Sequence, residues 1–104
     1  EEEEESAKAE VLRETARMLY GGRAFHEFRD ALEKSVKTRA DALMLIQLAE
    51  DISRDRMTAG EDPALMAVRI ELCEKARADL EQGMDRSRAL KRLYLELNDS
   101  NTRR

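Results

Sequence analysis

The chain has 104 residues, a formal net charge of −4 and a single cysteine. This length suits one domain, and one cysteine excludes both an intramolecular disulfide and a zinc site built on several cysteines. Ala, Leu, Glu, Lys and Arg make up 61 of the 104 residues, whereas Val and Ile together number six. A composition of this kind is typical of long helices and leaves little material for a sheet.

We therefore predict an all-α fold, a small antiparallel helical bundle or helical hairpin with coiled-coil-like packing. Its single domain is expected over residues 7–98. An acidic disordered tail precedes it at 1–6, because five consecutive Glu repel one another, and a frayed tail follows at 99–104. No run of about 18 apolar residues is present, so no transmembrane segment is predicted.

The first predicted helix starts at Ser6, a favourable N-cap, and its apolar residues recur at helical spacing from Val11 to Leu19. Gly21 and Gly22 interrupt it, at about 1 kcal/mol each relative to Ala inside a helix. The apolar phase nevertheless continues beyond them to Val36. We therefore favour one long helix that is kinked at the glycines, and a loop joining two helices stays open as the alternative.

The segment Met18-Leu19-Tyr20-Gly21-Gly22 locally resembles the Met-Leu-Tyr-x-Gly segment in the first long helix of flagellar export chaperones. The resemblance covers five residues. It implies a small helical bundle that holds an aggregation-prone secreted subunit.

The second helix is predicted over 39–57, opened by a capping-box-like pair of Thr38 and Asp41. Residues 42–49 are apolar nearly all round, which predicts a helix that is buried on all sides. Asp62-Pro63 then opens a helix over 63–82, because Asp is a strong N-cap and Pro suits the first helical position. Gly83 ends that helix, and 39–57 with 63–82 should form the core pair.

A last helix starts at Asp85 or Ser87 and is basic and amphipathic. One face carries Leu90, Leu93, Tyr94 and Leu97, and a basic patch is formed by Arg86, Arg88, Lys91 and Arg92. Four readings of the patch stay open. The patch is a phosphate-binding surface, a surface for anionic membranes, a site for an acidic partner protein, or a solvated face that offsets the acidic helices.

No residue set points to catalysis, a metal site or a cofactor. His26 is the only histidine, and no recognisable motif of nucleophile, base and second carboxylate surrounds it. We expect Cys73 to be a small, partly buried hydrophobe, and the alternative is a redox or intermolecular thiol. The five methionines either fill the core or line an adaptable groove. The chain is therefore expected not to be an enzyme.

These observations lead to a non-enzymatic protein–protein interaction module, an adaptor or chaperone-like binding protein that acts through exposed apolar helix faces. Its partner is another protein or a second copy, its compartment the cytoplasm, and its expected contact residues are Phe25, Phe28, Leu90, Leu93, Tyr94 and Leu97. The alternative is a small nucleic-acid-associated regulator that uses the basic patch. An acidic body is not typical of a dedicated nucleic-acid binder, which makes nucleic acid the less expected partner.

Overall fold

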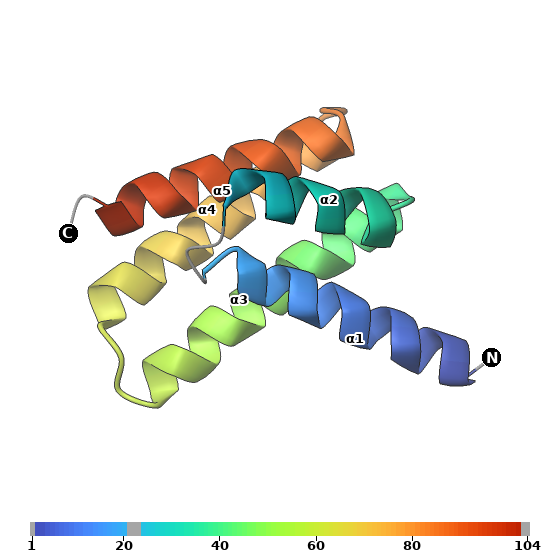
Figure 1. The fold of residues 1–104 in the computed structure, drawn as a ribbon. Helices are drawn as coiled ribbons and strands as arrows, with labels where there is room; N and C mark the ends of the chain where they lie inside the picture. Colours follow the sequence, from blue (N-terminus) through green and yellow to red (C-terminus); the bar gives the residue numbers. More distant parts are fainter. Residues whose placement is uncertain (1, 21–23, 103–104) are drawn as a thin grey trace.

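Five helices pack around one core in this protein, whose structure is a computed structural model (Figure 1). The backbone is described for residues 2–20 and 24–102, and the side chains for residues 7–20 and 24–98. The helices are α1 (Glu2–Met18), α2 (Phe25–Ser35), α3 (Arg39–Thr58), α4 (Pro63–Glu81) and α5 (Arg86–Thr102). No strand occurs in the described backbone, and the predicted all-α bundle is confirmed.

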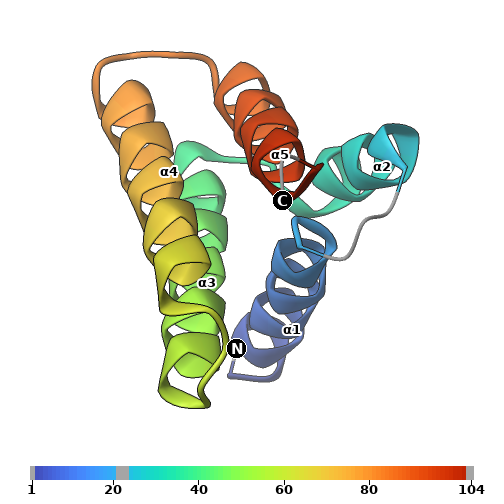
Figure 2. The same ribbon diagram turned by 90° about the vertical axis from the view of Figure 1, so that its left-hand side faces the viewer.

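The antiparallel α3–α4 hairpin is the most extensive helix pair, as predicted, and α1, α2 and α5 lie on one side of it (Figure 2). Thr38 Oγ1 accepts a hydrogen bond from the Asp41 N–H at 3.1 Å, and Asp41 Oδ2 accepts one from the Thr38 N–H at 3.2 Å. Asp62 caps α4 through the N–H groups of Ala64 and Leu65. These two caps are the predicted ones, and they place the helix starts where the sequence indicated.

The expectation that α3 is buried on all sides is wrong. Met44 is 45 % exposed, and Gln47 and Asp51 are exposed on the same face. The helix is covered by α4 on one side and by α1 on another, and no helix among the described residues covers the third side. A predominantly apolar segment of a small bundle can thus keep one face in solvent, because four other helices are too few to surround it.

The preference for one long helix across the glycines is also wrong, because α1 and α2 are separate. The last N–H groups of α1's final turn, from Leu19 and Tyr20, bond to the carbonyls of Ala16 and Arg17. The chain then reverses, so that α2 lies against α1 (Figure 1). Gly21 and Gly22 lie outside the described residues. The apolar phase continues across them because both helices face the same core.

The ends of the chain also differ from prediction. The helix α1 begins at Glu2 and not at Ser6, so the backbone of residues 2–6 is helical. Glu is a good helix former and is favoured near the positive N-terminal end of a helix. At the other end, α5 continues to Thr102, past the expected frayed boundary at residue 99. Glu1, Arg103 and Arg104 lie outside the described residues.

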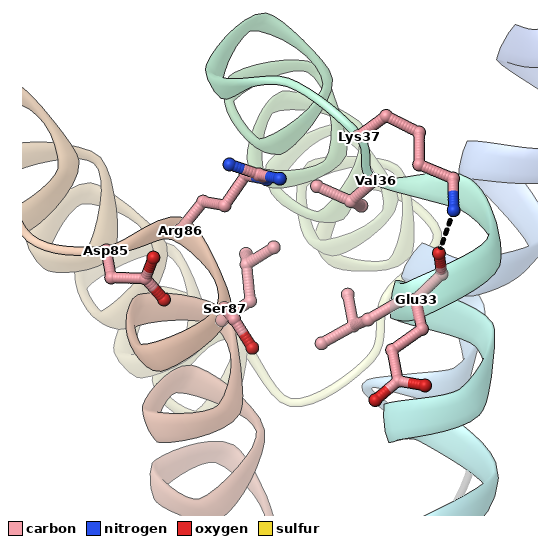
Figure 3. A pocket seen from close by; sticks show the side chains of 8 residues that line it. Glu33, Val36, Lys37, Asp85, Arg86 and Ser87 are labelled. Atoms are coloured by element: carbon pink, nitrogen blue, oxygen red, sulfur yellow. Dashed lines mark hydrogen bonds between the residues drawn. The ribbon is translucent and has the colours of Figure 1, made fainter.

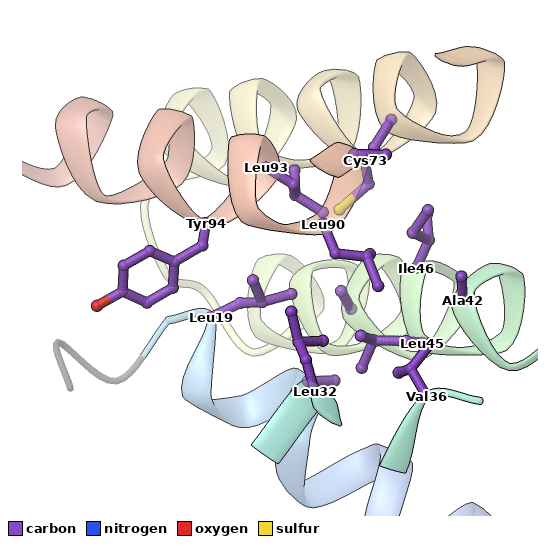
Figure 4. Packing of buried hydrophobic residues seen from close by; sticks show 14 of the residues in the cluster. Leu19, Leu32, Val36, Ala42, Leu45, Ile46, Cys73, Leu90, Leu93 and Tyr94 are labelled. Atoms are coloured by element: carbon purple, nitrogen blue, oxygen red, sulfur yellow. The ribbon is translucent and has the colours of Figure 1, made fainter. Parts of the chain in front are cut away.

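The core is built mainly from aliphatic residues of all the helices, and α5 packs over one side of it (Figure 4). Polar contacts tie the helices in register. The Tyr20 hydroxyl donates to the Ala49 carbonyl at 3.0 Å and accepts from the Ser53 hydroxyl at 2.9 Å, which joins α1 to α3. The buried carboxylate of Glu50 in α3 lies 2.9 Å from Arg77 Nη1 of α4. The hydrogen bonds of Tyr20 and the ion pair of Glu50 with Arg77 disfavour sliding of one helix along another.

Asp41 makes the bundle sensitive to acid. Burial opposes ionisation of its carboxyl, but the hydrogen bond from the Lys8 ammonium and those from the Lys37 and Thr38 N–H groups outweigh burial. They lower the pKa of Asp41 below its ordinary 3.8. A lowered pKa in the folded state means that the ionised carboxyl stabilises the fold above pH 4 and loses this effect as the pH falls through the folded-state pKa.

We predict that Asp41→Asn lowers the free energy of unfolding by about 1 kcal/mol near neutral pH, the usual size of a lost cap. The difference from the unsubstituted chain should shrink between pH 4 and pH 2. Urea unfolding followed by circular dichroism at several pH values measures it. Asp51→Asn, at an exposed position of the same helix, is the control and should stay within about 0.5 kcal/mol at every pH. If the loss of unfolding free energy in Asp41→Asn did not change with pH, the lowered pKa of Asp41 would be contradicted.

Candidate functional site

The expectation that the apolar stripe of α5 is exposed for a partner is wrong, because the stripe is part of the protein's own core. Leu90, Leu93, Tyr94 and Leu97 are between 0 and 5 % exposed (Figure 4). They pack against the other helices, so a charge at Leu93 would disrupt the fold itself. The one large apolar side chain that α5 leaves exposed, among its described residues, is Leu95, at 56 %.

The predicted contact residues of α2 are likewise used inside the molecule. Phe28 is fully buried and stacks on Tyr94, with ring centroids 4.8 Å apart. Phe25 is half-buried and meets the edge of the same ring at 5.4 Å. These aromatic contacts join α2 to α5. The positions of Phe25 and Phe28 are therefore explained by packing within the chain.

The predicted basic patch divides over two faces of α5. Arg86 faces α2, whereas Arg88, Lys91 and Arg92 form an outward stripe that ends at Leu95. Arg92 pairs with Asp79 of α4 at 3.8 Å and with Glu96 at 3.1 Å. No ion pair with a described residue involves the other three. Arg92 thus offsets acidic residues of the bundle, whereas a solvated face and a binding surface both stay open for the other three.

A hollow of about 260 Å³ lies between the C-terminal end of α2 and the N-terminal end of α5 (Figure 3). Its apolar lining is formed by Leu32, Val36 and Leu90, and its polar lining by Glu33, Lys37, Asp85, Arg86 and Ser87. The sequence interpretation missed this hollow, because its two walls are about fifty residues apart in the chain. Locally, the sequence shows only that cations lie near the end of α2, at Lys34 and Lys37, and at the start of α5, at Arg86 and Arg88.

The charged groups around the hollow differ in how they are engaged. Asp85 Oδ2 accepts the Arg88 N–H at 3.2 Å and so caps α5. Lys37 Nζ donates to the Glu33 carbonyl at the end of α2 (Figure 3). The Glu33 carboxylate points away from both cations, while Arg86 extends toward Val36. Arg86 is thus the charged side chain that reaches across the opening.

Two further hollows adjoin this one and share its residues. One is lined by the stripe of α5, and the other lies between α1, α2 and the start of α3. Seven cationic side chains and three carboxylates line the three together. Of the carboxylates, Asp41 is buried against Lys8 at 2.6 Å and Asp85 is used as a cap. We name the five cations without a carboxylate partner among the described residues the basic end: Lys34, Lys37, Arg86, Arg88 and Lys91.

The residues considered for chemistry lie apart from the basic end. His26 is exposed and has no hydrogen bond to a described side chain that would orient it as a base. Within the described residues, no three His, Cys, Asp or Glu side chains are grouped so that they could hold a metal ion. Met44 is exposed and Met66 buried, while Met18, Met57 and Met84 are half-buried, so they do not share one surface. No described helix combines the length and the apolar character that crossing a membrane requires.

Comparison of the chain with protein-family models, with curated proteins and with solved structures gave no match.

Cys73 is fully buried beside the Tyr20 hydroxyl, with Sγ 3.7 Å from the phenolic oxygen. Burial raises the pKa of the Cys73 thiol from 9.0 to about 11, although the hydrogen bond with Tyr20 acts in the opposite direction. Because each pKa unit changes the thiolate population tenfold, the reactive form is about a hundredfold rarer at pH 8 than in an ordinary thiol. The prediction that Cys73 is a buried hydrophobe is confirmed.

We predict that the native chain reacts with a disulfide reagent at pH 8 at least about a hundredfold more slowly than the unfolded chain. A stopped-flow absorbance trace measures the rate. The double variant Met44→Cys/Cys73→Ser, with its thiol at an exposed position, is the matched control and should react at the rate of a free thiol. Equal rates for the native chain and this control would contradict the burial of Cys73.

Proposed function

We propose that the chain is a non-enzymatic protein-interaction module, an adaptor or chaperone-like binding protein, and that it holds its partner at the basic end. The supporting observation is that five cations of an acidic chain line three adjoining hollows, one of which has Leu32, Val36 and Leu90 in its lining. A cytoplasmic location is part of the proposal, because a lone buried thiol suits a reducing compartment.

Folding does not account for two of these cations. Lys34 and Lys37 lie at the C-terminal end of α2, where positive charge is favourable. Arg86 and Arg88 lie in the first turn of α5, which contains no acidic residue, and each opposes the helix dipole by about 0.3–1 kcal/mol. A cost of this sign is expected where a residue is kept for a ligand. An anionic partner would reverse it.

A nucleic-acid-associated regulator is the alternative, because phosphates would meet the same cations. The apolar lining of the hollow and the exposed Leu95 favour a protein partner. Single-stranded nucleic acid is usually held by surface aromatic rings, whereas Phe28 and Tyr94 are buried.

We predict opposite effects of Arg86→Gln/Arg88→Gln on stability and on binding. The melting temperature should rise slightly or stay unchanged, because two charges that oppose the helix dipole are removed. Capture of the protein partner from native lysate by the tagged chain should fall at least about tenfold. Differential scanning calorimetry and quantitative mass spectrometry of nuclease-treated pull-downs measure the two effects.

The matched control is Arg13→Gln/Arg17→Gln, which removes two cations of α1 that pair with Glu10 and Glu14 of the same helix. Its captured proteins should be unchanged. Equal capture by all three forms would refute the basic end as the binding surface. Captured proteins that disappear after nuclease treatment would favour the regulator.

A further inference from the structure

We infer that the hollow between α2 and α5 receives an aliphatic side chain from an acidic segment of the partner, with Asp or Glu residues on both sides of a residue the size of leucine. This inference rests on the proposed protein-interaction function and specifies the chemistry of the partner.

The apolar part of the ligand follows from the lining. Leu32 of α2, its C-cap Val36 and Leu90 of α5 form the apolar floor of the hollow, and their side chains are 4 %, 7 % and 0 % exposed. The volume of about 260 Å³ is below the range of about 300–1,000 Å³ that is usual for pockets of whole small molecules. One aliphatic side chain of a docked segment therefore fits better than a cofactor. An anchor of this kind in a pocket is a common source of binding energy at interfaces.

The acidic part of the ligand follows from the positions of the cations. Arg86 and Lys37 come from the two walls of the hollow (Figure 3), while Lys34 lines the adjoining hollow next to α1, and Arg88 and Lys91 line the adjoining hollow on α5. A segment that places one residue in the hollow thus passes cations on both sides of it.

The two carboxylates at the rim do not reverse this charge preference. Asp85 and Glu33 line the hollow together with Lys37 and Arg86, so the excess of positive charge is supplied by Lys34, Arg88 and Lys91 in the two adjoining hollows. A basic segment would meet the five cations of the basic end and would be repelled.

The experiment uses the full chain and three fluorescein-labelled peptides as probes. They are Glu-Glu-Asp-Glu-Leu-Glu-Asp-Glu-Glu, the same peptide with Ala in place of Leu, and a Lys-rich peptide with the same Leu. Fluorescence anisotropy at low salt gives the dissociation constants. The acidic Leu peptide should bind about tenfold more tightly than the Ala peptide, because the Leu buries additional apolar surface. The Lys-rich peptide should not bind.

Two variants test the location. Ser87→Phe, at the half-buried rim of the hollow, should remove the advantage of Leu over Ala. Ala78→Phe, at an exposed position of α4, is the matched control and should keep it. Circular dichroism of both variants verifies that they are folded, and Arg86→Gln serves as a second variant that adds no bulk and should weaken both acidic peptides alike.

The outcomes separate this inference from the proposed function. Equal binding of the Leu and Ala peptides, or no binding of the Leu peptide, overturns the inference even if partner capture still depends on Arg86 and Arg88. Tighter binding of a labelled oligothymidylate than of the Leu peptide overturns it in favour of nucleic acid. Loss of the Leu advantage in Ser87→Phe alone supports it.

Discussion

The packing of α5 onto the other helices is the interaction on which the rest of this fold depends. Leu90, Leu93, Tyr94 and Leu97 are all nearly or fully buried. Each such side chain contributes about 1.5–3 kcal/mol by leaving water, so together they match the whole net stability of about 5–15 kcal/mol that is usual for a domain. A chain of 104 residues with four aromatic residues cannot leave this stripe for a partner. It needs these residues to fold at all.

The burial of α5 determines which surfaces remain for binding. Its apolar face is turned inward, so its polar positions point outward or toward α2, and Arg86 comes to lie beside the end of α2. The aromatic contacts of Phe25 and Phe28 with Tyr94 hold α2 against α5 at the opposite end of that pair from the hollow. The hollow is therefore a consequence of how the two helices diverge from a fixed contact.

Local signals in the sequence were sufficient for much of the fold. The Thr38–Asp41 capping box, the Asp62-Pro63 start and the stop at Gly83 involve neighbours within a few residues, and all three are present in the structure. Periodicity also identified the α5 stripe, but periodicity cannot say whether an apolar face meets its own core or a partner. That decision depends on the total apolar surface available, which is a property of the whole chain. The hollow was invisible for the same reason, because Val36 and Arg86 become neighbours only after folding.

The division between folding and function can be followed through the charges. Glu50 is paired with Arg77, Asp41 with Lys8, and Arg92 with Asp79, and each pair joins two helices. The side chains of Arg86 and Arg88 form no ion pair with a described residue. They lie at the N-terminal end of α5, where positive charge is unfavourable. A helix start needs acidic or neutral residues, and α5 already has Asp85 as its cap. Because these two arginines oppose the dipole of α5, the anionic partner that we propose would offset their unfavourable position.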